Sequence, residues 1–294
     1  MSDLQSATLE LSPLGFRHMD PMPAAEELAH YYAEKYFQEN SGPYSASYSD
    51  EEIQWFKLPA TMADYLVRQR QPQATTLSLL DVGCGEGFFM ERLQALGWDV
   101  KGYDYSRNGI EHFHPQLLSR FAQGDIYELL NQSIEHGETF DLINLSNVLE
   151  HVTDAHALLT RLRPLLSAKG LLRICVPNDF SDFQAYLIEK EKIDKEFWVC
   201  TPVHTHYFNL PSLRATIEAA GLRTEHMLAD FEIQEYLVHE GSNYIRDRTL
   251  GKQAHLARVA LDTFYSRNLP AFVKMREAEA ECGKGRCLIA FAGL

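Results

Sequence analysis

The sequence predicts an α/β fold in which helices cover a mostly parallel sheet. Between about residues 77 and 176, short apolar stretches alternate with helical stretches, as in strand-helix-strand units. The stretch from Leu79 to Phe89, LLDVGCGEGFF, joins an apolar run to alternating glycines, as a strand followed by a ligand-binding turn would. With 294 residues the chain can bury a full core, and we expect one large domain with additions.

The first 70 residues differ in character from this core. Residues 1 to about 25 carry three prolines without hydrophobic periodicity and are expected to form a loose arm, with ordering against the body as the alternative. From about residue 25 to 70 the pattern becomes helical and aromatic. Ser49 and Glu52 are spaced as a capping box, and we expect Pro59 to interrupt the helix that they open. These helices would form a cap over the sheet.

The predicted core spans residues 71–230 and contains six strands. We expect the strands at 77–82, 99–103, 119–123, 140–145, 170–176 and 222–229. We expect helices between the first five strands, at 86–96, 106–114, 126–135 and 153–167. Because right-handed crossovers bring the carboxyl ends of parallel strands to one edge, the ligand-binding loops should lie along that edge.

Two insertions extend the predicted core. The first, residues 178–205, contains the helical stretch FQAYLIEKEKI and precedes a helix around PSLRATIEAAG. The second, residues 231–283, is helical and polar. A last strand in residues 284–294 returns to the core.

Composition excludes several classes of partner. The net charge is −14 and the basic residues are scattered, whereas binding phosphates requires a basic face, so we expect no nucleic-acid partner. No run reaches about 18 apolar residues and the N-terminus lacks a signal-peptide pattern, so we expect no membrane partner and a cytoplasmic protein. The five cysteines lack the spacing of a zinc site, so we expect no metal ion. Their odd number and lack of a pairing pattern favour a reducing compartment.

Glycine spacing separates two kinds of nucleotide site. Dinucleotide folds use G-x-G-x-x-G, but Phe88 stands here where the third glycine should fall, which disfavours NAD. The stretch DVGCGEG instead resembles the first motif of class I S-adenosylmethionine (SAM) dependent methyltransferases, D-x-G-x-G-x-G. The resemblance implies SAM as the cofactor and places at its methionine end Asp81, Gly83, Cys84, Gly85 and Gly87.

Two acids follow the glycine loop in order. Asp104 lies 19 residues beyond Gly85, the interval at which an acid reaches the ribose hydroxyls of a bound nucleoside. A solvated acid at a strand end is the alternative, and Tyr105 could pack on the adenine. Asp125 alone would be a helix N-cap. In the resembling family an acid there accepts from the adenine amino group, and the next residue, Ile126, packs on the ring.

The fourth strand and its exit, FDLINLSNVLEHV, resemble the ubiquinone-biosynthesis-type branch of this family, methyltransferase type 11/23. The resemblance covers most of the chain after about residue 25. It implies that the backbone around Ser146 and Asn147 faces the methionine end of SAM. The Asn/Asp-Pro-Pro-aromatic motif of amide and nucleobase N-methyltransferases is absent, which disfavours those acceptors.

Three histidines are candidates for the acceptor side. His151 could take a proton from an acceptor hydroxyl, because its ordinary pKa is about 6.5, or it could simply anchor its loop. His204 and His206 lie in TPVHTHYF, which resembles the branch's P-x-H-x-x-F/Y-F segment. The resemblance places them near the acceptor, where either could act as a base or bind the acceptor. Tyr36 and Tyr44, in the aromatic cap, could close over the site or merely pack.

The resemblance as a whole implies a seven-stranded Rossmann-like sheet of order 3-2-1-4-5-7-6. It implies a SAM-dependent methyltransferase for a small molecule in bacterial secondary or polysaccharide metabolism, and O-methylation is our first expectation. Two alternatives stay open: an acceptor-free SAM-cyclising enzyme of the azetidine-2-carboxylate synthase type, which releases methylthioadenosine, and a non-catalytic SAM-binding module. A homodimer also stays open.

Overall fold

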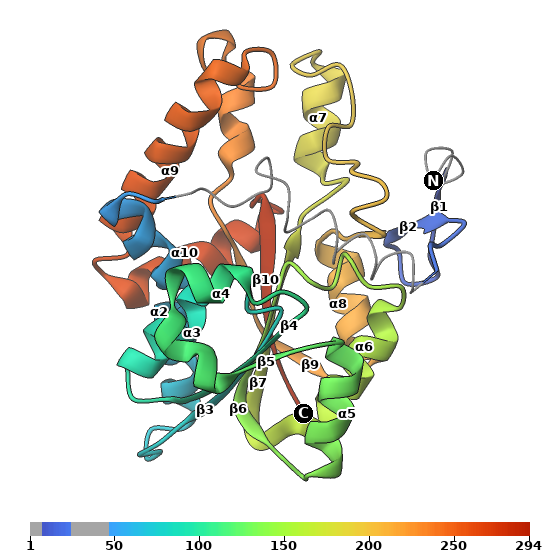
Figure 1. Ribbon diagram of the computed structural model, residues 1–294. Coiled ribbons are helices and arrows are strands. Elements are labelled where there is room, and N and C mark those ends of the chain that lie inside the picture. Colours follow the sequence, from blue (N-terminus) through green and yellow to red (C-terminus); the bar gives the residue numbers. More distant parts are fainter. Residues whose placement is uncertain (1–7, 25–46) are drawn as a thin grey trace.

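A seven-stranded sheet forms the centre of the protein (Figure 1). The computed structural model describes residues 8–24 and 47–294. In chain order, the strands of this sheet are β3 (Ser78–Val82), β4 (Asp99–Asp104), β5 (Phe121–Gln123), β6 (Phe140–Ser146), β7 (Leu166–Pro177), β9 (Arg223–Ala229) and β10 (Cys287–Gly293). Their spatial order is β5-β4-β3-β6-β7-β10-β9, with β10 antiparallel to both its neighbours and the pairs from β5 to β7 parallel. The predicted fold and strand order are therefore confirmed.

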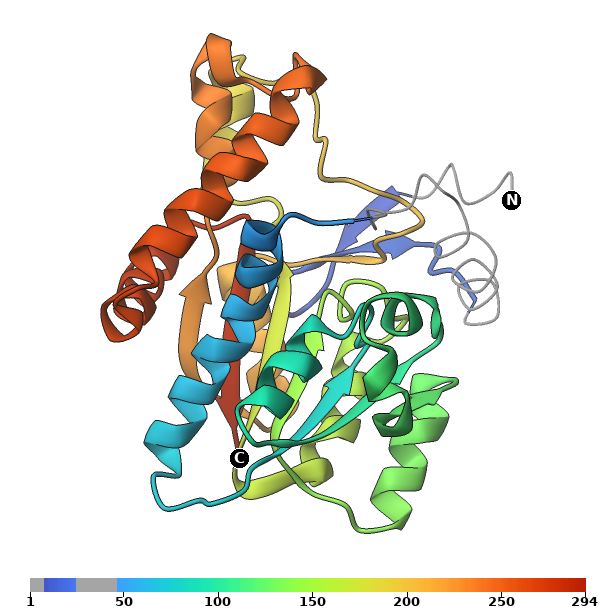
Figure 2. The same cartoon turned by 60° about the vertical axis from the view of Figure 1, so that its left-hand side comes forward.

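Helices cover both faces of this sheet (Figures 1 and 2). One face packs against α5 (Ile126–Glu135), α6 (Ala155–Leu162) and α8 (Leu210–Ala219). The other packs against α2 (Asp50–Arg70), α3 (Phe88–Ala95), α4 (Asn108–Phe113) and α10 (Leu269–Glu281). Because side chains alternate across a strand, Leu79 of β3 belongs to the second layer and Leu80 to the first. The result is a three-layer α/β/α domain.

Helix α2 begins at the predicted capping box. The Ser49 hydroxyl accepts from the Glu52 N–H at 3.3 Å, and the Glu52 carboxylate accepts from the Ser49 N–H at 2.9 Å. The predicted interruption at Pro59 is wrong, because the helix continues through it to Arg70. Proline removes one backbone hydrogen bond, but five apolar residues of the helix after it are buried, and this packing holds the helix together.

The end of α6 also differs from the prediction. A helix was expected to reach residue 167, but α6 ends at Leu162, and a short 3-10 helix, η4 (Arg163–Leu165), follows. Pro164 lies in this turn, and because proline has no backbone N–H, it cannot donate the hydrogen bond that would continue the α-helix. Strand β7 consequently begins at Leu166, four residues before the expected start.

The described part of the predicted arm, residues 8–24, is ordered by pairing with the body of the protein. Strands β1 (Thr8–Leu11) and β2 (Arg17–Asp20) form an antiparallel hairpin, and β2 pairs with β8 (His206–Tyr207) in a second, three-stranded sheet. Met19 is fully buried there. The partner strand lies almost 190 residues away in the chain, so local periodicity could not indicate this pairing.

The two predicted insertions pack together in an upper lobe, which stands at the top of Figure 1. This lobe contains α7 (Asp182–Glu189), η5 (Ile233–Val238), η6 (Glu240–Ser242), η7 (Arg248–Leu250) and the start of α9 (Gly251–Tyr265). Its small core combines Leu187, Ile193 and Trp198 of the first insertion with Leu237 of the second. Among the described residues, no helix is long and apolar enough to cross a membrane.

Candidate functional site

The glycine loop connects β3 to α3 at the carboxyl edge of the sheet. Gly83, Gly85 and Gly87 all have positive φ angles, of +75°, +53° and +82°, which side-chain-bearing residues rarely adopt. The N–H of Gly83 donates to the Tyr103 carbonyl at 2.8 Å. A Cβ on Gly83 would stand 2.4 Å from Cγ2 of Val148, so the loop also touches the segment after β6. The sequence therefore has glycine where the backbone conformation requires it.

Asp104 fixes this loop from the neighbouring strand. One of its carboxylate oxygens accepts from the Gly85 N–H at 2.8 Å, and the other accepts from the Ser106 N–H at 2.9 Å. Burial raises the pKa of Asp104, and the backbone donors oppose that rise. A carboxylate offers about four acceptor positions, so the backbone donors of Gly85, Tyr105 and Ser106 leave acceptor capacity for a ligand hydroxyl. Asp104 is thus placed beside the loop, as a ribose-binding acid would be.

Asp125 caps α5, which is one of the two roles that the sequence allowed, and its contact with the adenine amino group stays a prediction. One oxygen caps α5 by accepting from the N–H groups of Tyr127 and Glu128 at 2.8 and 3.0 Å. The other accepts from the Tyr105 hydroxyl at 2.6 Å, which joins two predicted cofactor residues. Ile126 is buried in the core under α5. Tyr105 and Asp125, unlike Ile126, are partly exposed and therefore accessible to a nucleoside.

Asp81 and Cys84 lie beneath the loop. The Asp81 carboxylate accepts from the Asn144 amide at 2.6 Å, and the Asn144 carbonyl in turn accepts from Arg173 at 2.7 Å. Burial raises the pKa of Asp81 to about 7. The Cys84 side chain is also buried. Its sulfur packs against Gly102, where an added Cβ would stand only 3.0 Å from it. Both side chains therefore support the loop from below.

Ser146 and Asn147 follow β6 at the same edge. Asn147 has a φ of +53°, is exposed, and its N–H donates to the Cys175 carbonyl at 2.9 Å. The turn that they begin leads through Val148, the neighbour of Gly83, to the histidine side of the site. The structure thus brings the glycine loop, both acids and the β6 exit to one edge, as predicted for a nucleoside site.

His151 and His204 come together next to this edge. Their ring centroids lie 4.9 Å apart, and Nδ1 of His151 lies 2.7 Å from the Val203 carbonyl. Burial lowers the pKa of both histidines. For His204, neighbouring His151 and Arg286 lower it further, to about 3. Both imidazoles are therefore neutral at pH 7.

His206 points elsewhere. Its Nδ1 lies 2.9 Å from the Thr205 hydroxyl, and its ring packs between Phe16 of the N-terminal hairpin and Phe208, at centroid distances of 5.2 and 6.0 Å. Burial lowers the pKa of His206 to about 4. The structure gives this residue a packing environment in the small sheet, apart from the pair of His151 and His204.

Two further groups near the site escaped the sequence reasoning. Glu150 precedes His151, and its side chain is only 2% exposed. Glu86, inside the glycine loop, accepts a 2.9 Å hydrogen bond from the Tyr48 hydroxyl, and burial raises its pKa to about 7. The Tyr48 ring packs against Phe56 at 4.7 Å, so one tyrosine of the predicted aromatic cap does reach the loop. The acid in L-E-H-V was the available signal for Glu150.

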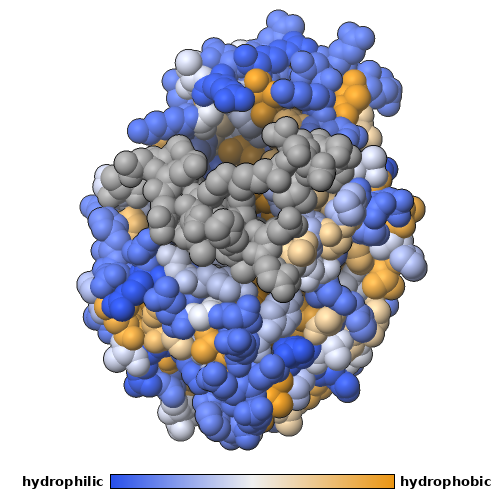
Figure 3. All heavy atoms as spheres, turned by 45° about the vertical axis from the view of Figure 1, so that its right-hand side comes forward, coloured by the Kyte–Doolittle hydropathy of each residue, from blue (hydrophilic) through white to orange (hydrophobic). Residues whose placement is uncertain are grey.

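Figure 3 shows hydrophobic atoms in a hollow below the hydrophilic upper part of the molecule. The predicted lid residues Tyr36 and Tyr44 lie outside the described residues, so their role stays a prediction.

Comparison with known proteins gives a consistent result. The profile of a family described as "Methyltransferase domain" matches residues 55–227, which is more than half of the chain. A ubiquinone biosynthesis O-methyltransferase of Rhodopseudomonas palustris (strain TIE-1) is 28% identical over 134 residues, covering 45% of this chain and 51% of the relative. One from Glaesserella parasuis is 33% identical over 106 residues, covering 34% and 45%. The matched part thus spans about half the length of these curated relatives.

Among solved structures, a SAM dependent methyltransferase from Archaeoglobus fulgidus aligns with a TM-score of 0.48 and 17% identity. The alignment covers 79% of this chain and 93% of that one.

Proposed function

Because the chain belongs to the methyltransferase domain family, we propose that it methylates a hydroxyl group of a small molecule. The predicted family is confirmed, and so is its cofactor, SAM. O-methylation is supported by the names of the relatives, ubiquinone biosynthesis O-methyltransferases. The chemical class of the acceptor is a proposal for this chain, because this chain matches only about half the length of those relatives.

The observation that carries the proposal is the convergence of three predicted elements at one edge. The three glycines of the loop, all at positive φ angles, carry no side chain that would block the approach of a ligand to their backbone. Asp104 retains acceptor positions beside it, and Asp125 presents a partly exposed carboxylate one strand further. These donors and acceptors match the carboxylate, ribose and adenine parts of SAM in order.

When bound, SAM supplies a sulfonium methyl group, which an acceptor oxygen takes in line while the carbon–sulfur electron pair stays on sulfur. The residues of this chain contribute positioning and the exclusion of water. The acceptor hydroxyl must also lose its proton. We assign the neutral imidazoles of His151 and His204 to the acceptor site, because His151 follows Val148, the neighbour of the glycine loop, and His204 lies beside it. A neutral imidazole can accept the proton.

Asp104→Ala is expected to weaken binding of SAM and S-adenosylhomocysteine by roughly 10- to 100-fold, about 1.5 to 3 kcal/mol for a hydrogen-bonded charged acceptor. The carboxylate would no longer reach the ribose or hold the Gly85 N–H. Titration calorimetry measures the affinity.

Asp99→Ala is the matched control, because Asp99 begins the same strand at its opposite end and pairs on the surface with Arg120. Its affinity for SAM should equal that of the unaltered protein. A folded Asp104→Ala variant with undiminished affinity would remove Asp104 from the cofactor site.

A further inference from the structure

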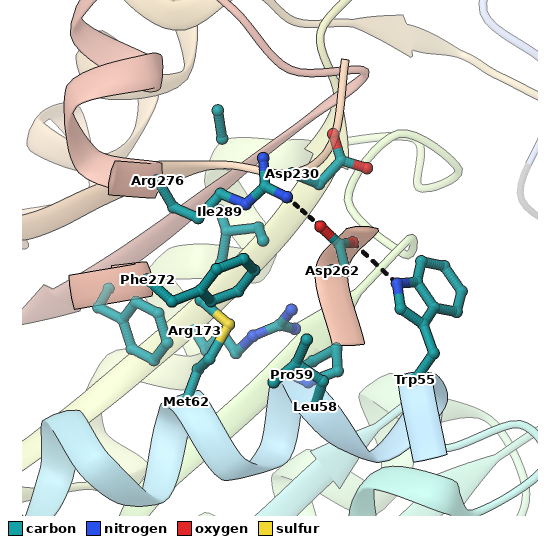
Figure 4. A pocket seen from close by; sticks show the side chains of 12 residues that line it. Trp55, Leu58, Pro59, Met62, Arg173, Asp230, Asp262, Phe272, Arg276 and Ile289 are labelled. Carbon is teal, nitrogen blue, oxygen red and sulfur yellow. Dashed lines mark hydrogen bonds and ion pairs between the residues drawn. The ribbon is translucent and has the colours of Figure 1, made fainter. Parts of the chain in front are cut away.

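We propose that the cavity between α2, the sheet and the C-terminal helices binds a small carboxylic acid, as its anion, on the guanidinium of Arg173 (Figure 4). This ligand site goes beyond methyl transfer and does not depend on the acceptor. The cavity has a volume of about 60 Å³. A water-sized group needs about 10 to 15 Å³, so the cavity has room for a ligand of about four to six non-hydrogen atoms.

Arg173 brings a buried charge to the cavity wall. This residue of β7 is 3% exposed, and Figure 4 shows its guanidinium pointing into the cavity. A guanidinium has five N–H donors, and Nη1 of Arg173 donates to the Asn144 side-chain carbonyl at 2.7 Å. The central guanidinium carbon lies 5.3 Å from the centroid of the Phe89 ring. Within the described part of the chain, the Arg173 side chain makes no further hydrogen bond and no ion pair, so most of its donors lack an acceptor.

The nearest carboxylate compensates this charge only in part. The Asn144 amide separates Arg173 from Asp81, to which it donates at 2.6 Å. Burial raises the pKa of Asp81 to about 7, so this carboxyl group is about half neutral at pH 7. A buried cation is costly unless a full counter-charge and acceptors surround it. An anion in the cavity supplies both.

The other charged groups at the cavity wall already have partners. Asp262 and Arg276 form a buried ion pair. Burial raises the pKa of Asp230 to about 6, and three nearby arginines oppose that rise. They are Arg258, Arg276 and Arg286. The electrostatic attraction for an anionic ligand therefore comes from the guanidinium at the β7 wall.

The shape and polarity of the wall indicate the class of ligand. The planar fork of a guanidinium matches the two oxygens of a carboxylate. Most of the remaining wall is apolar and consists of Leu58, Pro59, Met62, Phe272, Ile289 and Phe291. Phosphate or sulfate would place polar oxygens against these side chains without hydrogen bonds, which is costly. A short aliphatic acid such as propionate or butyrate instead satisfies the guanidinium with one end and the apolar wall with the other.

Calorimetric titration of the full chain tests the site, without SAM and in a buffer free of carboxylates. Butyrate should bind saturably at one equivalent, and butyramide, which has a similar shape but no charge, should bind at least 10-fold more weakly. Arg173→Met should weaken butyrate binding at least 10-fold, because the charged donors are lost. Leu58→Trp keeps the guanidinium but fills the cavity from α2, and it should weaken butyrate binding by a similar factor.

Arg92→Met is the matched control. Arg92 lies in α3 on the same side of the sheet, donates to the Thr61 hydroxyl at 3.0 Å and does not line the cavity. This variant should bind butyrate like the unaltered chain. The site would be overturned by the absence of saturable binding, by equal affinity for butyramide, or by undiminished butyrate affinity in folded Arg173→Met and Leu58→Trp. An equal loss in Arg92→Met would also contradict it. Because the assay contains no SAM, its outcome is independent of the proposed function.

Discussion

Gly85→Val is expected to reduce binding of SAM at least 100-fold while the sheet stays folded. Gly85 has a φ of +53°, which a β-branched residue adopts only with strain, and its N–H is held by Asp104. A valine would distort the loop and place methyl groups where the ligand must approach the backbone. Titration calorimetry with SAM and S-adenosylhomocysteine measures the loss, and circular dichroism reports the fold.

Gly97→Val is the control that separates the effect of backbone strain from a loss of SAM binding. Gly97 also has a positive φ, of +87°, but nothing lies within 4 Å of the Cβ that it would gain, and it follows α3 at the other end from the loop. This variant should lose stability but bind SAM normally. If Gly85→Val bound SAM as well as Gly97→Val does, the cofactor pocket would not be at the glycine loop.

The second large effect concerns a cavity between α2, β9, β10 and the C-terminal helices (Figure 4). There Asp262 of α9 pairs with Arg276 of α10 and accepts a 2.9 Å hydrogen bond from the Trp55 indole of α2. Figure 4 shows both interactions at the cavity wall. The side chains of Asp262 and Arg276 are 8% and 4% exposed. One buried carboxylate therefore connects three helices.

Asp262→Ala is expected to lower the free energy of unfolding by about 3 to 5 kcal/mol. Among the described residues, the buried guanidinium of Arg276 would keep one carboxylate partner, Glu279 at 2.6 Å, and the Trp55 N–H would lose its acceptor. Urea denaturation measures the change.

Glu111→Ala removes an exposed ion pair with Arg107 at 3.1 Å and should change the free energy of unfolding by less than about 1 kcal/mol. Pairing Asp262→Ala with Arg276→Met should recover much of the loss, because no buried charge is then left unpaired. A single Asp262→Ala variant as stable as Glu111→Ala would show that the ion pair does not hold these helices.

The core of the fold was predictable because its signals are local. Strand β3 is a short, largely apolar run, and the glycines at 83, 85 and 87 after it stand at positions that require positive φ angles. Capping acids and hydroxyls, such as Ser49 and Asp125, fixed two helix starts to the residue. The family resemblance then supplied the strand order, which local patterns do not contain.

What escaped prediction depends on contacts between distant segments. The hairpin of residues 8–20 gains its pairing partner near residue 206, and Pro59 is tolerated because the following turns of α2 are buried. The buried chain from Asp81 through Asn144 to Arg173 crosses three strands. Glu150 becomes unusual only when folding removes it from water and places His204 beside it.

The central claim is methyl transfer to a second molecule, and the products formed from SAM test it most directly. Purified protein should be incubated with SAM alone, and with SAM plus hydroxyl-bearing acceptors such as catechols, and the products measured by mass spectrometry. Attack on the methyl group leaves S-adenosylhomocysteine, whereas ring closure by the SAM amine leaves methylthioadenosine. The account predicts little enzyme-dependent product from SAM alone and S-adenosylhomocysteine with a methylated acceptor when the acceptor is present. Rapid, enzyme-dependent methylthioadenosine without any acceptor would contradict it.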